Sequence, residues 1–111
     1  MFASPHVIDV TEDNFDEQVL RSELPVLVDF TAVWCPPCRA LAPHVAAMAE
    51  AYSGRVRVAT CDVDGSPALA AKMDVRAMPT VMVFQRGRVV GQIVGAVPRA
   101  KLDALVSRVL A

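Results

Sequence analysis

This sequence of 111 residues is poor in cysteine and has no surplus of basic charge. It holds three cysteines, and 12 acidic residues oppose 11 basic ones, for a formal net charge of −1. A chain without a basic surplus cannot neutralise many phosphates, so nucleic acid is not an expected partner. A small and odd number of cysteines is untypical of secreted domains held together by disulfides.

Long hydrophobic runs are absent as well. No apolar stretch approaches the ~20 residues of a membrane-spanning helix. The first residues, "MFASPHVIDVTEDNF", have neither the basic start nor the apolar core of a signal peptide. We therefore expect no membrane association and a cytoplasmic location. The apolar content of 54% is enough to form a core without cross-links, so residues 1–111 are predicted to be one domain. We also expect a monomer.

Hydrophobic periodicity predicts alternating strands and helices. Strands are expected over 6–10, 25–32, 55–64 and in two halves of 79–96, and helices over 12–22, 37–53, 67–73 and from Pro98 onward. Pro43 predicts a kink inside the second helix, and Gly87 a hairpin turn between the last two strands. The order βαβαβαββα requires parallel pairing across the helical crossovers and antiparallel pairing at the hairpin. We expect an α/β fold with a central mixed β-sheet and helices on both faces.

The motif that carries chemistry is "TAVWCPPCRA", in which Cys35 and Cys38 lie three positions apart. A structural zinc site needs four ligands, and one cysteine pair with Cys61 and two separate histidines does not supply them. Attachment of a c-type haem needs histidine after the second cysteine, where this chain has Arg39. A redox dithiol agrees with the context, because the pair lies where a buried strand ends and a helix begins.

A helix that starts at the proline pair would place Cys35 against unpaired N–H groups and the positive end of the helix dipole, which stabilise a thiolate. We expect the sulfur of Cys35 to be exposed. Cys38, one turn further, should be shielded and attack only a partner already bonded to Cys35. Asp29, in a buried strand, has two interpretations. It is a base with a raised pKa that takes the proton from Cys38, or an acid with a structural hydrogen bond.

Four segments resemble the thioredoxin family: the strand and motif "VLVDFTAVWCPPC", the helix "RALAP", the loop "AMPT" and the strand "VVGQIVGA". The resemblance runs from about Val7 to Leu110, and its motifs are specific in combination. It implies a thioredoxin fold with Cys35 as the attacking thiol, Cys38 as the resolving thiol and Asp29 as the buried acid.

The resemblance also implies a cis bond before Pro79 and an apolar docking surface around the cysteines. That surface would comprise Trp34, Pro36, Pro37, Val63, Ala77, Met78, Pro79, Val94, Gly95 and Ala96. The implied activity is that of a protein thiol–disulfide oxidoreductase, which reduces substrate disulfides through a mixed disulfide at Cys35 resolved by Cys38. No metal and no bound cofactor are implied beyond the redox-active Cys35–Cys38 disulfide. Electrons would come from NADPH through a separate flavin enzyme, thioredoxin reductase.

Two alternative functions remain open on the sequence alone. The residues between the cysteines tune the redox potential, so the chain could be a disulfide oxidase or isomerase. It could also be a non-catalytic binding module that holds a partner, or a metal shared by the cysteine pairs of two chains. Cys61, in a predicted core strand, is interpreted as an inert apolar side chain.

Three positions depart from the family pattern. Pro36 stands where glycine is usual and lacks an N–H that could face the sulfur of Cys35. We therefore expect a less stabilised thiolate and a shifted redox potential. Thr60 stands where a lysine often lies near the buried acid, so we expect a higher pKa for Asp29. Thr31 replaces a second tryptophan, which leaves a single indole in the chain.

Overall fold

The computed structural model describes residues 6–110. Residues 1–5, which belong to the segment used to argue against a signal peptide, and residue 111 lie outside this range. The elements are strands β1 (Val7–Asp9), β2 (Val26–Thr31), β3 (Arg57–Asp62), β4 (Thr80–Gln85) and β5 (Arg88–Val94), a π-helix η1 (Asp16–Leu20), and helices α1 (Pro36–Ala51), α2 (Pro67–Lys72) and α3 (Arg99–Leu110). Across the described range, no helix has the length and apolar character needed to cross a membrane.

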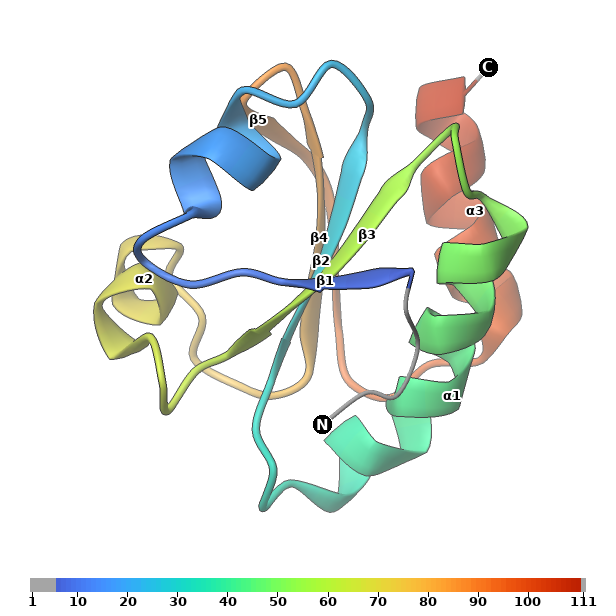
Figure 1. Cartoon of the computed structure of the whole chain (residues 1–111). Helices are drawn as coiled ribbons and strands as arrows, with labels where there is room; N and C mark the ends of the chain where they lie inside the picture. The colour runs from blue at the N-terminus through green and yellow to red at the C-terminus, as the bar shows by residue number, and fades with distance from the viewer. Residues whose placement is uncertain (1–5, 111) are drawn as a thin grey trace.

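The strands form one mixed sheet in the order β1-β3-β2-β4-β5. Strand β3 pairs in parallel with β1 and β2, whereas β4 pairs antiparallel with β2 and β5. Figure 1 shows the helices in two layers, with α1 and α3 on one face of the sheet and η1 and α2 on the other. The predicted α/β class, the mixed pairing and the helices on both faces are confirmed.

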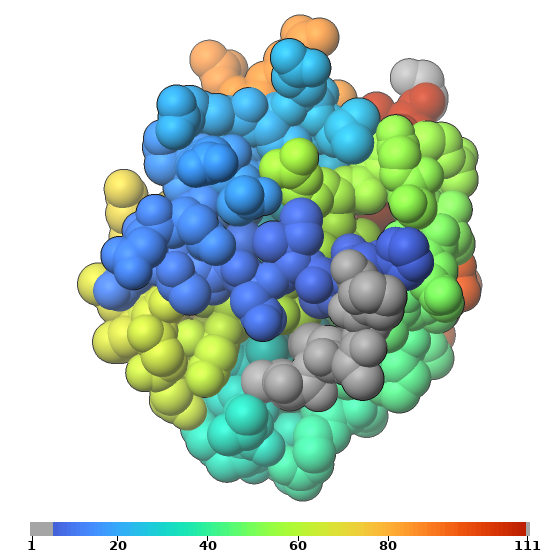
Figure 2. Space-filling view, viewed as in Figure 1, coloured from blue at the N-terminus to red at the C-terminus, as the bar shows by residue number. Residues whose placement is uncertain are grey.

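The segment between β1 and β2 differs from its prediction. A helix was expected over 12–22, but the chain makes turns up to Asn14 and then only the short helix η1. Glu12 instead reaches α2, where its Oε2 accepts the N–H groups of Ala68 and Leu69 at 2.8 and 3.2 Å. Figure 2 shows this N-terminal segment, in blue, lying against α2 in yellow. The carboxylate of Glu12, which the prediction placed in the first turn of a helix over 12–22, is therefore bonded to a distant segment.

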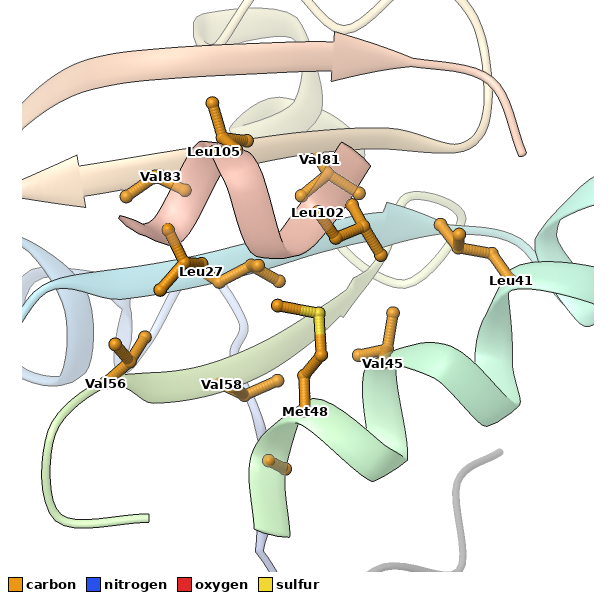
Figure 3. Close-up of a cluster of buried hydrophobic side chains, with 12 residues drawn as sticks. Leu27, Leu41, Val45, Met48, Val56, Val58, Val81, Val83, Leu102 and Leu105 are labelled. Atoms are coloured by element: carbon orange, nitrogen blue, oxygen red, sulfur yellow. The ribbon is translucent and has the colours of Figure 1, made fainter. Parts of the chain in front are cut away.

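Two apolar cores lie on opposite faces of the sheet, because successive residues of a strand point to opposite sides. On one face, Leu27 of β2 packs with Val45 of α1 and Leu102 of α3 (Figure 3). On the other, the rings of Phe15 and Phe84 meet edge to face, with centroids 5.5 Å apart. All six residues of β2 are buried between these cores. Its C-terminal end, which leads into the cysteine motif, is therefore held rigidly at the edge of the sheet where α1 begins.

Candidate active site

A turn after β2 delivers Cys35 to the N-terminus of α1. Cys35 is the N-cap residue, with φ −98° and ψ 110°, and its Sγ accepts the backbone N–H of Cys38 at 3.3 Å. Pro36 and Pro37 fill the first two helical positions. Because proline has no N–H, the N–H of Cys38 is the first one that this helix can offer to the sulfur. The expected position of Cys35 at a helix N-terminus is confirmed.

The two cysteines lie at disulfide-bonding distance, with Cα atoms 5.2 Å apart. Cys38 is 1% exposed, as expected for the shielded member of the pair. The prediction of an exposed Cys35 is wrong, since this residue is only 4% exposed. The physical reason is that Val63 and Met78 pack against the pair. Cys35 is thus shielded by apolar side chains from two other loops.

The surroundings of Cys38 disfavour its thiolate. Burial raises the pKa of this thiol, a hydrogen bond with Cys35 raises it further, and hydrogen bonds with the Thr31 side chain and the Ala32 backbone lower it. Cys38 therefore needs a base before it can attack. The contact with Thr31 was missed in the sequence, where the position was considered only as lacking a tryptophan. The available signal was its place two residues after Asp29, on the same face of β2.

Asp29 lies at the centre of the sheet and has no exposed surface. Its neighbours in register are Thr60 of β3 and Val81 of β4. Within residues 6–110, neither carboxylate oxygen has a hydrogen-bond partner, so the interpretation as an acid with a structural hydrogen bond is not supported. Burial raises the pKa of Asp29 from 3.8 to about 7. The group can therefore exchange a proton near neutral pH.

The loop before β4 contributes the backbone nearest to the sulfurs. The Met78–Pro79 peptide bond is cis, as the family resemblance implied. The carbonyl oxygen of Met78 lies 3.8 Å from the Sγ of Cys35. The carbonyl of Pro79, a buried residue, accepts the N–H of Gly95 at 2.8 Å, which holds the end of β5 against this loop.

The other residues of the expected docking surface lie around this centre. Val63 packs against the cysteine pair, whereas Pro36, Pro37, Ala77, Val94 and Ala96 are exposed. Trp34 is 59% exposed, and its indole N–H donates to Oδ2 of Asp64 at 2.6 Å. Asp64 was not identified from the sequence, because nothing local to it indicates a contact with an indole in another loop.

The part of the chain that the structure describes holds no candidate metal cluster, and its third cysteine is not part of the Cys35–Cys38 pair. No group of three or more His, Cys, Asp or Glu side chains there could hold a metal ion. Cys61 is a free thiol with no exposed surface, and burial is the main cause that raises its pKa to about 11. Among the described residues, the thiols at disulfide-bonding distance are Cys35 and Cys38.

Comparison with known proteins agrees with this geometry. The thioredoxin family model matches residues 6–108. A thioredoxin from Streptomyces clavuligerus is 49% identical over 94 residues, which cover 85% of this chain and 87% of that protein. One from Synechocystis is 44% identical over 110 residues, or 99% of this chain and 100% of that protein. The chloroplastic M-type thioredoxin of Spinacia oleracea is 39% identical over 108 residues, which are 97% of this chain and 60% of that protein. The chain thus belongs to the thioredoxin family and is a thiol–disulfide oxidoreductase.

Proposed function

We propose that this chain reduces disulfides in other proteins, with Cys35 as the attacking thiol. The observation that carries the proposal is the place of Cys35 at the N-cap of α1, with Cys38 at bonding distance. In the first step, the Cys35 thiolate bonds to one sulfur of the substrate disulfide. The substrate S–S bond breaks, and its second sulfur leaves as a thiolate that takes up a proton from solvent.

In the second step, Cys38 gives its proton to the carboxylate of Asp29 and attacks the sulfur of Cys35. The Cys35–Cys38 bond forms and the mixed disulfide breaks. The substrate sulfur leaves as a thiolate that takes up a proton from solvent, so the substrate departs as a dithiol that has gained two electrons. Burial supports both roles, because it raises the pKa of Cys38, which then needs a base, and raises that of Asp29 to about 7. Thr31 is a neighbour of both Asp29 and Cys38, since it is two residues after Asp29 on the same face of β2 and hydrogen-bonds to Cys38.

The proline pair favours a reductant over a disulfide oxidase. Each N–H aimed at the Cys35 thiolate would stabilise the reduced form and make the disulfide a stronger oxidant. Pro36 and Pro37 remove two such donors from the first turn of α1 and leave that of Cys38. With fewer donors, the disulfide form is relatively favoured, so the dithiol gives up its electrons more readily.

The substrate segment docks on the apolar surface next to the Met78 carbonyl, most of whose residues are exposed or half-buried. The proposed surface consists of Trp34, Pro36, Pro37, Val63, Ala77, Met78, Pro79, Val94, Gly95 and Ala96. A flavin-containing thioredoxin reductase then returns the Cys35–Cys38 disulfide to the dithiol with electrons from NADPH. The chain acts as a monomer and as one domain in the cytoplasm, where reducing conditions keep a thiol such as Cys61 free.

Trapping the intermediate tests the roles of the two cysteines. Cys38→Ser cannot complete the second step, so its reduced form mixed with insulin should accumulate a mixed disulfide at Cys35. Mass spectrometry should show an adduct with the summed mass of the variant and insulin. Dithiothreitol should reduce the mixed disulfide and release the insulin. Cys35→Ser should form no adduct, and Cys61→Ser should reduce insulin as the wild type does. Wild-type protein that fails to turn over insulin with dithiothreitol would instead support the binding-module alternative.

A further inference from the structure

Thr60 stands between two carboxyl side chains. The strand register pairs it with Asp9 of β1 on one side and with Asp29 of β2 on the other. Residues paired across parallel strands point to the same face of a sheet, so the three side chains form a row on the face covered by α1. Neighbouring strands lie ~4.8 Å apart. A hydroxyl on the middle strand can therefore reach a carboxylate on either side.

The Thr60 hydroxyl has one proton to donate, and Asp9 receives it. Thr60 Oγ1 donates to Asp9 Oδ1 at 3.0 Å. Asp29 is fully buried, and both of its carboxylate oxygens lack a partner among the described residues. A hydrogen bond to a carboxylate favours its charged form. The orientation of the Thr60 hydroxyl, toward Asp9 or toward Asp29, therefore decides whether Asp29 has a donor that stabilises its negative charge.

We propose that Asp9 is a positioning residue for the proton transfer: it holds the Thr60 hydroxyl and thereby keeps Asp29 without a hydrogen-bond donor. This inference rests on the role proposed for Asp29 as the base for Cys38. Asp9 lies at the exposed end of the row, on the wall of a surface hollow of about 340 Å³ that Thr60 also lines. Asp9 acts through Thr60, because β3, the strand that carries Thr60, lies between β1 and β2.

The side chains that pack on this face of the sheet, within residues 6–110, are mostly apolar, and they include Leu41, Val45, Val81 and Leu102. Of the titratable groups, Cys38 is hydrogen-bonded to Thr31. On α3, Asp103 pairs with Arg99 and accepts a hydrogen bond from the hydroxyl of Tyr52, the C-cap residue of α1. Asp62, at the end of β3, accepts the N–H of Asp64. Thr60 is thus the hydroxyl next to Asp29 in the strand register.

A pH titration of the Asp29 carboxyl carbon by NMR tests the proposal. It is run on the disulfide form, in which neither active-site thiol titrates. Asp9→Ala removes the acceptor, so we expect the Thr60 hydroxyl to turn to Asp29 and to lower the pKa of Asp29 by about one unit. Asp9→Asn removes the charge but keeps an oxygen acceptor, and should leave this pKa as in the wild type. Thr60→Val added to Asp9→Ala removes the donor and should restore the wild-type pKa.

Three results would overturn the proposal. The first is an unchanged pKa of Asp29 in Asp9→Ala. The second is an equal fall in Asp9→Ala and Asp9→Asn, which would assign the effect to the charge of Asp9. The third is a fall that persists when Thr60→Val is added.

Insulin reduction separates this inference from the proposed function. If Asp29 is the base, the acid side of the pH–rate profile should move to lower pH in Asp9→Ala and stay in place in Asp9→Asn. An Asp29→Asn variant with wild-type turnover would refute the role of Asp29 in turnover. The NMR titration would still report whether Asp9 controls the Thr60 hydroxyl.

Discussion

Asp29 links the proposed chemistry to the stability of the fold. A fully buried carboxyl without a hydrogen-bond partner is costly to ionise. An apolar side chain of similar size would pack at this position without that cost. The ionisable group at the centre of β2 therefore disfavours folding when it is charged, so its effect on stability depends on pH. This cost agrees with the proton transfer proposed for Asp29.

Stability should fall as the pH rises from about 4 to about 7. The pKa of Asp29 is about 7 in the folded chain, against 3.8 without burial. Between these values the folded chain holds a proton that the unfolded chain has lost, so the contribution is fully present below about pH 4 and lost as the pH rises through 7. Asp29→Asn cannot ionise. Relative to wild type, its free energy of unfolding should gain about 3–4 kcal/mol between pH 4 and pH 8, measured by urea denaturation.

The control for this prediction is Asp13→Asn, at an exposed position in the turns before η1. Its stability should change with pH as that of the wild type does, because an exposed carboxyl loses little solvation on folding. Parallel loss of stability in wild type and Asp29→Asn between pH 4 and pH 8 would show that another group titrates.

At the scale of the element, the first turn of α1 controls the reactivity of Cys35. Pro36→Gly adds an N–H at the first helical position, where it can face the sulfur and stabilise the thiolate. We expect faster alkylation of reduced protein by iodoacetamide at pH 6. We also expect the equilibrium with glutathione to shift toward the dithiol, because stabilising the reduced form makes the disulfide easier to reduce.

The matched control is Pro67→Gly, which makes the same change at the start of α2. Both measurements should stay at their wild-type values in this variant, because Pro67 begins a helix that does not carry the cysteines. A Pro36→Gly equilibrium constant equal to that of the wild type would show that the added N–H does not reach the sulfur.

The contact between β5 and α3 depends on the absence of a side chain at Gly91. A Cβ at this position would overlap Cδ1 of Leu105, a buried residue of α3, and would lie 3.1 Å from Nη2 of Arg108. Gly91→Ala should therefore lower the free energy of unfolding by about 1–3 kcal/mol, measured by urea denaturation. Gln92→Ala, at the exposed neighbouring position, should change it by no more than ~0.5 kcal/mol. Equal stability of the two variants would mean that Leu105 moves aside without cost.

At the scale of the whole molecule, the layers could be predicted because each depends on a local pattern. The apolar run of β2, the helical spacing in α1 and the two crossovers lead to a mixed sheet with helices on both faces. The helix predicted over 12–22 is shorter in the structure, where only η1 forms and Glu12 instead bonds to α2, far away in the sequence. No local pattern indicates such a contact.

The same distinction holds for the site. Cys35, Cys38 and Asp29 stand out as unusual residues within their own segments, and the docking residues came from the family resemblance. The row through Thr60 depends on β3 lying between β1 and β2, an order that element types alone do not determine. The shielding of Cys35 likewise results from residues of two other loops.

That shielding has a consequence for which disulfides react. Val63 and Met78 pack against Cys35, a residue that is 4% exposed, so we expect these side chains to slow the approach of a second sulfur atom. A polypeptide that binds with enough area to push these side chains aside gains access, whereas a small disulfide has little binding energy to do so. We therefore expect protein disulfides, which can bind before electrons are transferred, to react faster with this chain than small disulfides do.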